Sequence, residues 1–271
     1  MKVARIKDPS GTVQLVTPIS ETEGEILEGN IIFGLTPTDR TVEIAQWLSP
    51  VEPADIYCIG LNYRRHAEET GLDIPENPVV FMKPSTALTH PNAPIVIPAA
   101  CTHGPEVDYE AELAVIIGRT ARDVSVENAL DHVLGYTCAN DVSSRKWQMH
   151  GGGGQWVRSK SWDSFCPLGP VLVTADEIPD PNTLAISLRL NGALMQSSNT
   201  SDMIFSVPEL IAFLSRDTTL RPGTAILTGT PEGVGFTREP PVYLKNGDHT
   251  AVEIEGIGTL HNDVLDPREQ S

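Results

Sequence analysis

The sequence predicts a β-rich α+β fold rather than an array of βαβ units. Many short runs alternate apolar and polar residues, a pattern that is typical of strands with one buried face. Asn-Gly pairs at residues 191–192 and 246–247 lie beside such runs, and this dipeptide favours tight turns between strands. Only a few segments have the spacing of apolar residues that is typical of helices.

The N-terminal part of the chain is expected to form a unit of its own. The runs VARIKD, VQLVTP and IIFGL predict three strands, and TVEIAQWL (41–48) predicts a helix. The next segment, SPVEPADIY, contains two prolines and is interpreted as a linker. The sequence therefore predicts a small strand-rich N-terminal subdomain over residues 1–52 and a main domain over residues 53–271.

Three helices are expected in the main domain. GLNYRRHAEETG predicts a short helix that Gly71 closes, and VENALDHVLGY predicts a second helix that ends near Gly135. In FSVPELIAFLSR, Ser206 is the expected N-cap, Pro208 lies in the first turn and Glu209 completes a capping box. The other segments are interpreted as short strands, among them a hairpin around residues 191–192.

The composition is that of a globular protein with a strongly acidic balance. The chain has 271 residues, a formal net charge of -17 and a pI near 4.7. Negative charge repels phosphate backbones and anionic lipids, so neither nucleic acid nor a membrane is expected as a partner. The four cysteines form no CxxC pair, the start MKVARIKDPSGTVQL lacks the features of a signal or transit peptide, and the sequence contains no run of about 18 apolar residues. These features favour a cytoplasmic protein.

The segment VDYEAELAVIIG (107–118) places carboxylates inside an apolar run. On a strand, Asp108, Glu110 and Glu112 share one face, which is either a solvent-facing edge or the wall of a cation site. Side chains two residues apart lie about 6.5–7 Å apart at Cα, so two carboxylates can reach one hard metal ion. Asp141, at the end of another predicted strand, is the natural third ligand. Three carboxylates suit Mg²⁺ or Mn²⁺.

A histidine and a glutamate form a second group of candidate residues. His66 and Glu69 lie three residues apart in the first predicted helix and share one of its faces. Glu69 can hold the imidazole in one tautomer and raise its basicity, although an exposed pair of this kind is more often a surface ion pair. The neighbouring Arg64 and Arg65 are positioned to attract an anion.

Two glycine-containing segments carry further candidate residues. GGGGQWVRSKSWD lacks the Gly that a phosphate-binding P-loop requires immediately before Lys-Ser, and glycines 151–154 are interpreted as part of a lid. In the same segment, Lys160 is either a buried amine between two tryptophans or an extended surface lysine. In ILTGTPEGVG, Thr228 and Thr230 either offer donors to an oxygen anion or belong to a structural turn.

Together these segments resemble the fumarylacetoacetate hydrolase family from about Ile56 to Val264. The motifs GLNY…H, DYEAEL, ANDVSSRKWQ, SKSWDSFCPLGP and LTGTPEGVG occur in the family's order and approximate spacing. Five ordered motifs are more specific than any one of them. PPVYLKNGD and RKWQ are most similar to one branch, the fumarylacetoacetate hydrolase domain-containing proteins. The resemblance implies a mixed β-sandwich roll, a homodimer and a bound Mg²⁺ or Mn²⁺ ion.

The resemblance also implies roles for individual residues. The residues fall into three groups: the metal ligands Glu110, Glu112 and Asp141; the catalytic residues His66 (general base), Glu69 (its orienting partner) and Lys160; and the substrate contacts Arg145, Gln148 and Thr230. Two positions depart from the family's pattern. Lys146 stands where many relatives have Asp, and Ser159 stands where many have Gly. Both departures bear on the identity of the substrate more than on metal binding.

The reaction implied by the resemblance is metal-assisted chemistry on a small anionic 2-oxo acid, through a stabilised enolate. We expect hydrolysis of a C–C bond in an acylpyruvate-like β-diketo acid, by a water that His66 and Glu69 activate. The alternative is the tautomerisation or decarboxylation of oxaloacetate. A non-catalytic metal-binding scaffold is less favoured, because a scaffold has no need of a base beside its metal.

Overall fold

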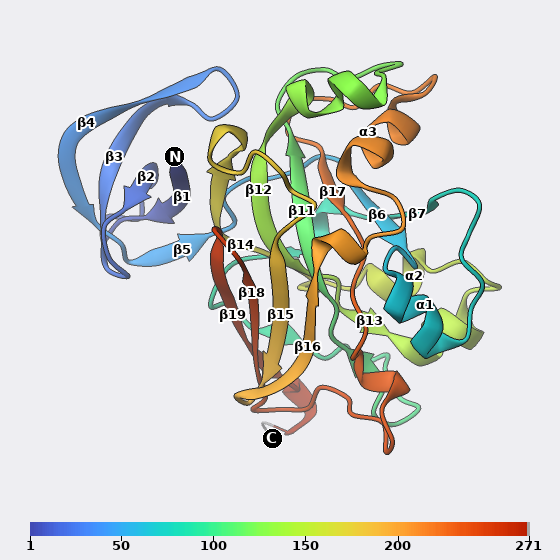
Figure 1. Ribbon diagram of the computed structural model, residues 1–271. Coiled ribbons are helices and arrows are strands. Elements are labelled where there is room, and N and C mark those ends of the chain that lie inside the picture. Colours follow the sequence, from blue (N-terminus) through green and yellow to red (C-terminus); the bar gives the residue numbers. More distant parts are fainter. Residues whose placement is uncertain (270–271) are drawn as a thin grey trace.

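The structure is a computed structural model that describes residues 1–269. Within this range the strands form sheets of twelve, five and two strands, and the few helices lie at their margins (Figure 1). Both antiparallel and parallel neighbours occur in the sheets. The expected β-rich α+β class, with mixed sheets arranged as a sandwich-like roll, is confirmed.

The twelve-stranded sheet connects the N-terminal strands with the interior of the molecule. In spatial order its strands are β4 (Gly34–Glu43), β3 (Glu23–Asn30), β2 (Val13–Pro18), β1 (Lys2–Lys7), β14 (Cys166–Thr174), β12 (Val133–Asn140), β11 (Ala111–Ile117), β17 (Ala225–Leu227), β6 (Ile56–Gly60) and β7 (Val79–Lys83). Two short strands lie off this path, β5 (Gln46–Leu48) beside β1 and β8 (Leu88–Thr89) beside β14.

The other elements complete the main body. The five-stranded sheet runs in the order β16 (Ala193–Asn199), β15 (Ala185–Leu190), β18 (His249–Ile254), β19 (Gly258–Leu265) and β9 (Ile95–Val96), and β10 (Val107–Asp108) pairs with β13 (Ser143–Ser144). The α-helices are α1 (Arg64–Thr70), α2 (Val157–Lys160) and α3 (Val207–Ser215). Shorter helical segments are Ser85–Ala87, Val126–His132, Trp147–Gly151, Ala175–Glu177, Thr200–Asp202, Gly235–Thr237 and Pro267–Glu269. Over residues 1–269, no helix is long and apolar enough to cross a membrane.

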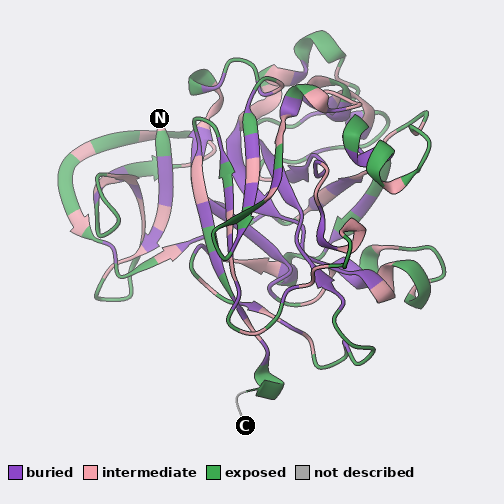
Figure 2. Ribbon diagram, turned by 60° about the horizontal axis from the view of Figure 1, so that its bottom comes forward, coloured by how far each residue is buried: buried purple, intermediate pink, exposed green. Residues whose placement is uncertain are grey.

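The central strand β11 is buried on both faces. The five-stranded sheet packs on β11, β12 and β14, and Leu113, Val115 and Ile117 belong to the core on that side. Ala114 and Ile116 belong to a second apolar cluster on the opposite side. Figure 2 shows the resulting continuous buried region across the central strands. A charged group buried within β11 therefore needs a partner inside the protein.

The predictions for the N-terminal segment are only partly right. The first two predicted strands are confirmed as β1 and β2. The helix predicted over residues 41–48 is wrong, because this segment ends β4 and forms β5, whose backbone pairs with β1. The strand predicted over IIFGL is also wrong, because the chain turns between β3 and β4 and exposes Phe33 to 90%. Since β1 pairs with β14, the division at residue 52 stays a prediction.

Of the three helices predicted in the main domain, two are confirmed. Helix α1 ends at Gly71 in the left-handed conformation, and α3 begins with the expected capping box. The helix predicted over VENALDHVLGY is wrong, because only a 3-10 helix forms at Val126–His132 before β12 begins. Strand β12 pairs with β11 on one side and β14 on the other, and these contacts outweigh local helix propensity. The hairpin at Asn191-Gly192 is confirmed between β15 and β16.

Candidate active site

Three carboxylates meet inside the main body. Glu110, Glu112 and Asp141 are all buried, and each offers an oxygen atom within 4.8 Å of the others. Glu112 lies on β11, Asp141 follows β12 directly, and Glu110 lies in the two-residue break between β10 and β11. The strand predicted to run unbroken from residue 107 is therefore interrupted beside the cluster.

The pairing of β11 with β12 explains this convergence. The antiparallel register places Ala111 opposite Asn140, so the residues that flank this pair come together. The Asn140 side chain accepts a hydrogen bond from the Glu110 backbone N–H at 3.0 Å, and the Asp141 N–H donates to the Glu110 carbonyl at 2.9 Å. The break at Glu110 thus has its backbone groups satisfied, and its side chain turns toward Asp141.

Lys160 is a buried amine that contacts two of the carboxylates. Its Nζ lies 2.8 Å from Glu110 Oε2 and 2.6 Å from Asp141 Oδ2, and it donates to Ser143 Oγ at 2.7 Å. Burial acts to lower the pKa of Lys160, but Asp141 and Glu110 raise it above its ordinary value. The surface-lysine interpretation is thus wrong, and the side chain is a protonated group inside the site.

Lys83 is a second buried cation that sequence reasoning missed. Its Nζ lies 2.6 Å from Asp141 Oδ1 and donates to the carbonyls of Val142, Lys160 and Phe165. Lys83 ends β7, which lies beside β6 at the far end of the large sheet. The available signal was a lysine that closes the apolar run VVFM, but only the tertiary fold brings it to Asp141.

Asp108 lies outside the three-carboxylate cluster and binds Arg145. Its Oδ2 accepts from Arg145 Nε at 2.8 Å, and its two oxygens also accept from the backbone N–H groups of Gly235 and Phe236. Arg145 Nη1 lies 2.6 Å from Glu110 Oε1 and 2.9 Å from the Gln148 side-chain oxygen. The Phe236 ring lies 4.4 Å from the Arg145 guanidinium carbon. Asp108 therefore orients the arginine rather than joining the other three carboxylates.

The charges in this region suggest where a cation would bind. Four buried carboxylates face three buried cations: Asp108, Glu110, Glu112 and Asp141 against Lys83, Arg145 and Lys160. Burial would raise the pKa of Glu110, but Lys160 and Arg145 hold it down at about 2. Burial, Asp141 and Glu110 raise the pKa of Glu112 well above its ordinary value, and its Oε2 accepts only the Gly229 N–H among the hydrogen bonds of the described residues. This oxygen-only donor set fits a hard divalent cation, which would compensate Glu112.

The histidine of α1 lines the same cavity and contacts the glutamate of this helix. His66 is only 7% exposed, and its Nδ1 lies 3.1 Å from Glu69 Oε2. The other oxygen, Glu69 Oε1, accepts from the Gly233 N–H at 3.0 Å and from Thr237 Oγ1 at 2.8 Å. Burial alone would raise the pKa of Glu69, but hydrogen bonds from His66, Thr237 and Gly233 hold it below its ordinary value. The surface-ion-pair interpretation is wrong for His66.

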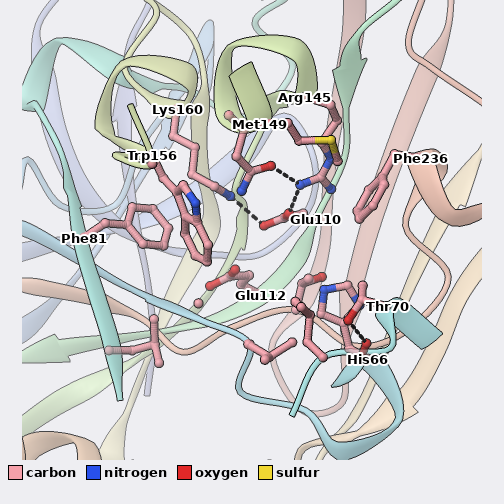
Figure 3. Close-up of a pocket in the computed structure, with 17 residues that line it drawn as sticks. His66, Thr70, Phe81, Glu110, Glu112, Arg145, Met149, Trp156, Lys160 and Phe236 are labelled. Atoms are coloured by element: carbon pink, nitrogen blue, oxygen red, sulfur yellow. Dashed lines mark hydrogen bonds and ion pairs between the residues drawn. The ribbon is translucent and has the colours of Figure 1, made fainter. Parts of the chain in front are cut away.

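The cavity has a volume of about 370 Å³ and unites most of the predicted site residues (Figure 3). His66, Glu110, Glu112, Arg145, Gln148, Lys160 and Thr230 all line it. Trp156 and Phe81 form an apolar wall, with their ring centroids 5.7 Å apart in an edge-on contact. Thr230 Oγ1 accepts from Gln196, whereas Thr228 donates its hydroxyl to the Leu113 carbonyl.

The remaining sequence interpretations concern the rim of the site. Gly154 lines the cavity, and the preceding residues form a π-helix at Trp147–Gly151, so closure of this segment as a lid stays a prediction. Ser159 is buried and donates to the Trp156 carbonyl. The Arg65 side chain is exposed and lies 3.6 Å from Glu232. The predicted site residues are thus brought together, while their roles stay predictions.

A histidine, a lysine and a carboxylate cluster meet in this cavity, beside the mixed sheets. This combination is typical of enzymes that act on small molecules. The chain belongs to the fumarylacetoacetate hydrolase family. A sequence model of that family, described as "Fumarylacetoacetate (FAA) hydrolase C-terminal", matches residues 55–265.

Relatives in sequence and structure support this membership. "Oxaloacetate tautomerase fahd2, mitochondrial" of Xenopus laevis is 48% identical over 219 residues, which cover 80% of this chain and 68% of the relative. An uncharacterised protein from Mycobacterium abscessus has a structure that matches with a TM-score of 0.84 at 41% identity, covering 98% of this chain and 100% of that one. A 5-carboxymethyl-2-hydroxymuconate delta-isomerase from Mycobacterium smegmatis matches at 0.84 and 37%, with the same coverage. The expected likeness to the fumarylacetoacetate hydrolase domain-containing proteins is confirmed, because a domain-containing protein 2 homolog of Dictyostelium discoideum is 43% identical over 244 residues.

Proposed function

We propose that this chain is a divalent-metal-dependent tautomerase that interconverts the keto and enol forms of oxaloacetate. The observation that carries the proposal is that His66 and Lys160 line one cavity beside the carboxylate cluster. One of these groups can accept a proton from carbon, and the other can stabilise charge on oxygen. Tautomerisation replaces C–C hydrolysis as our first choice, because a relative 48% identical to this chain is named an oxaloacetate tautomerase.

The charges of the cavity suit an anionic substrate once a cation is bound. Glu110, Glu112 and Asp141 would hold the divalent cation, which would supply a Lewis acid that favours enolate formation. Among the described residues, Arg145 Nη2 has no hydrogen-bond partner, so it can donate to a substrate carboxylate. Gln148 lies beside the same guanidinium and holds it in place through Nη1.

The proton transfer is assigned to the α1 pair and to Lys160. Because Glu69 accepts from His66 Nδ1, the opposite ring nitrogen, Nε2, is left as the base that takes a proton from the carbon next to the keto group. Lys160 is held protonated by Asp141 and Glu110, so its ammonium group stabilises negative charge on the former keto oxygen. Return of a proton to that oxygen yields the enol, and no water is consumed.

Hydrolysis of an acylpyruvate is the second candidate, and the apolar wall is the observation that favours it. Phe81 and Trp156 give the 370 Å³ cavity a surface that a four-carbon dicarboxylate has no group to fill. An acylpyruvate with an apolar acyl group would bury that group there. In that reaction the His66–Glu69 pair would activate a water instead of accepting a proton from carbon.

Parallel assays on one preparation distinguish these reactions. Enol absorbance reports oxaloacetate tautomerisation, pyruvate release reports decarboxylation, and loss of acetylpyruvate reports C–C cleavage, each measured with Mg²⁺ and with EDTA. We expect the largest Mg²⁺-dependent acceleration for tautomerisation. A preparation that cleaves acetylpyruvate but leaves the oxaloacetate tautomers at their spontaneous rate would contradict the proposal and favour the hydrolase.

We also propose that the chain forms a homodimer in the cytoplasm. Val79, Val80 and Met82 are 37–39% exposed on β7, the edge strand of the large sheet, and an apolar edge of this kind favours association. The four cysteines are free and buried, which agrees with a reducing compartment. Light scattering of the eluted protein measures the mass, and a monomer at micromolar concentration would contradict the dimer.

A further inference from the structure

The loop at residues 231–237 contacts two residues that each hold a cavity side chain in place. It follows Thr230 directly and ends in the short helix Gly235–Thr237. On one side it contacts Glu69, the partner of His66, and on the other side it contacts Asp108, the partner of Arg145. None of the loop's own side chains was assigned a role from the sequence.

On the Glu69 side, two donors of the loop bind one carboxylate oxygen. The Gly233 N–H and the Thr237 hydroxyl lie 3.0 and 2.8 Å from Glu69 Oε1, which leaves Oε2 for His66. Thr237 Oγ1 also lies 2.9 Å from the Val234 carbonyl, but a hydroxyl has one proton to donate. The charged carboxylate is the stronger acceptor of the two. Thr237 therefore fixes the rotation of the Glu69 carboxylate about its last bond.

On the Asp108 side, the loop is anchored by its backbone. Asp108 Oδ1 accepts from the Gly235 N–H at 2.8 Å, and Oδ2 accepts from the Phe236 N–H at 3.0 Å. Gly235 has no room for a side chain, because a Cβ atom there would lie 1.9 Å from the Val242 carbonyl oxygen. Asp108 is fully buried, and its two hydrogen bonds hold the short helix that carries Thr237.

We propose that Thr237 is a positioning residue: through Glu69 it sets the orientation and the tautomer of His66. The chain of contacts runs from the Asp108 anchor through the loop to Thr237, Glu69 and His66. A carboxylate only accepts hydrogen bonds, so Glu69 Oε2 requires the proton of His66 on Nδ1 and leaves Nε2 free toward the cavity. Without the Thr237 hydroxyl the carboxylate can rotate, and the imidazole loses its fixed partner. The catalytic consequence rests on the function proposed above.

The test combines kinetics with a readout that needs no turnover. Thr237→Val removes the hydroxyl at nearly constant size, Thr237→Ser restores it, and exposed Thr218→Val is the matched control. Nitrogen NMR of ¹⁵N-histidine-labelled protein, with His66 assigned by His66→Gln, reports the tautomer. We expect Thr237→Val to lower kcat by about 10- to 100-fold with KM nearly unchanged, and to give His66 mixed tautomers. Thr237→Ser and Thr218→Val should match the parent in both measurements.

The pathway through Glu69 is tested by a double variant. In a Glu69→Gln background, Thr237→Val should lower kcat by no more than about twofold, because the two changes interrupt the same path. The inference would be overturned if the effects of the two substitutions on kcat multiply. It would also be overturned if Thr237→Val keeps a parent-like kcat and a single His66 tautomer. If the parent turns over neither oxaloacetate nor acetylpyruvate, the proposed function fails, but the NMR comparison still decides whether Thr237 positions His66.

Discussion

Individual residues in the cavity differ in what holds them in place. Lys160 contacts only side chains, namely Glu110, Asp141 and Ser143, and it lines the cavity. Lys83 also contacts Asp141, but its other contacts are three backbone carbonyls. The first lysine is held by side chains at the cavity, whereas the second connects separate chain segments behind the site. Substitutions of the catalytic and structural groups should therefore differ in their effects.

Replacing His66 should impair the chemical step more than binding. His66→Ala is expected to lower kcat by about 10² to 10⁴-fold with little change in KM, because a general base acts in the transition state. Steady-state kinetics on oxaloacetate with Mg²⁺ measure both constants, and exposed His103→Ala is the control. Full activity of His66→Ala on every substrate of the parent would remove the base from the mechanism.

Replacing Lys83 should impair stability. Lys83→Met leaves Asp141 without one of its two lysine partners and leaves three buried carbonyls without this donor. Removing one partner of a buried ion pair costs about 3–5 kcal/mol. Urea unfolding of the metal-free protein measures the difference, with exposed Lys245→Met as control. Equal stability of Lys83→Met and the parent would contradict the structural role.

At the scale of elements, sequence signals at the ends of helices predicted those ends correctly. Gly71 closes α1 with φ 66°, a conformation that other residues rarely adopt. In α3 the Ser206 N–H donates to Glu209 Oε2 at 2.7 Å. This bond satisfies a backbone donor that has no partner within the helix. The segment at residues 126–136 has no comparable cap, and there the pairing of β12 decided the structure.

The capping box of α3 should contribute measurably to stability. Glu209→Ala is expected to lower the free energy of unfolding by about 1 kcal/mol, the usual contribution of a helix cap. Glu209→Gln keeps an acceptor for the Ser206 N–H and should lose much less. Thermal unfolding of the two variants provides the measurement, and equal losses would show that the charge of Glu209 matters rather than its hydrogen bond.

At the scale of the whole molecule, burial gathers carboxylates that a bound cation would compensate. β11 is covered by apolar clusters on both faces, and the carboxylates at its start are buried where they line the cavity. The chain carries a net charge of -17, so it offers no general attraction to an anionic substrate. Three buried cations and a divalent ion would give the cavity a local positive charge within an acidic protein.

Binding of that ion should stabilise the whole fold. Mg²⁺ or Mn²⁺ at about 100 times its dissociation constant is expected to add about 2.7 kcal/mol to the free energy of unfolding. Glu112→Gln should lose most of this gain, whereas exposed Glu76→Gln should keep it. Melting curves with increasing metal, and with EDTA, measure the effect. A melting temperature that does not change with Mg²⁺ or Mn²⁺ would argue against a metal site at these residues.

The sequence by itself determined the features that depend on neighbouring residues. The hairpin at residues 191–192, the ends of α1 and α3, and the alternation of Glu110 and Glu112 all follow from short stretches of chain. Only the tertiary structure decided that Asp108 binds Arg145, that Lys83 reaches Asp141 and that residues 133–136 join β12 rather than the predicted helix. These outcomes depend on partners distant in the sequence, and inside a buried sheet such contacts outweigh local preference.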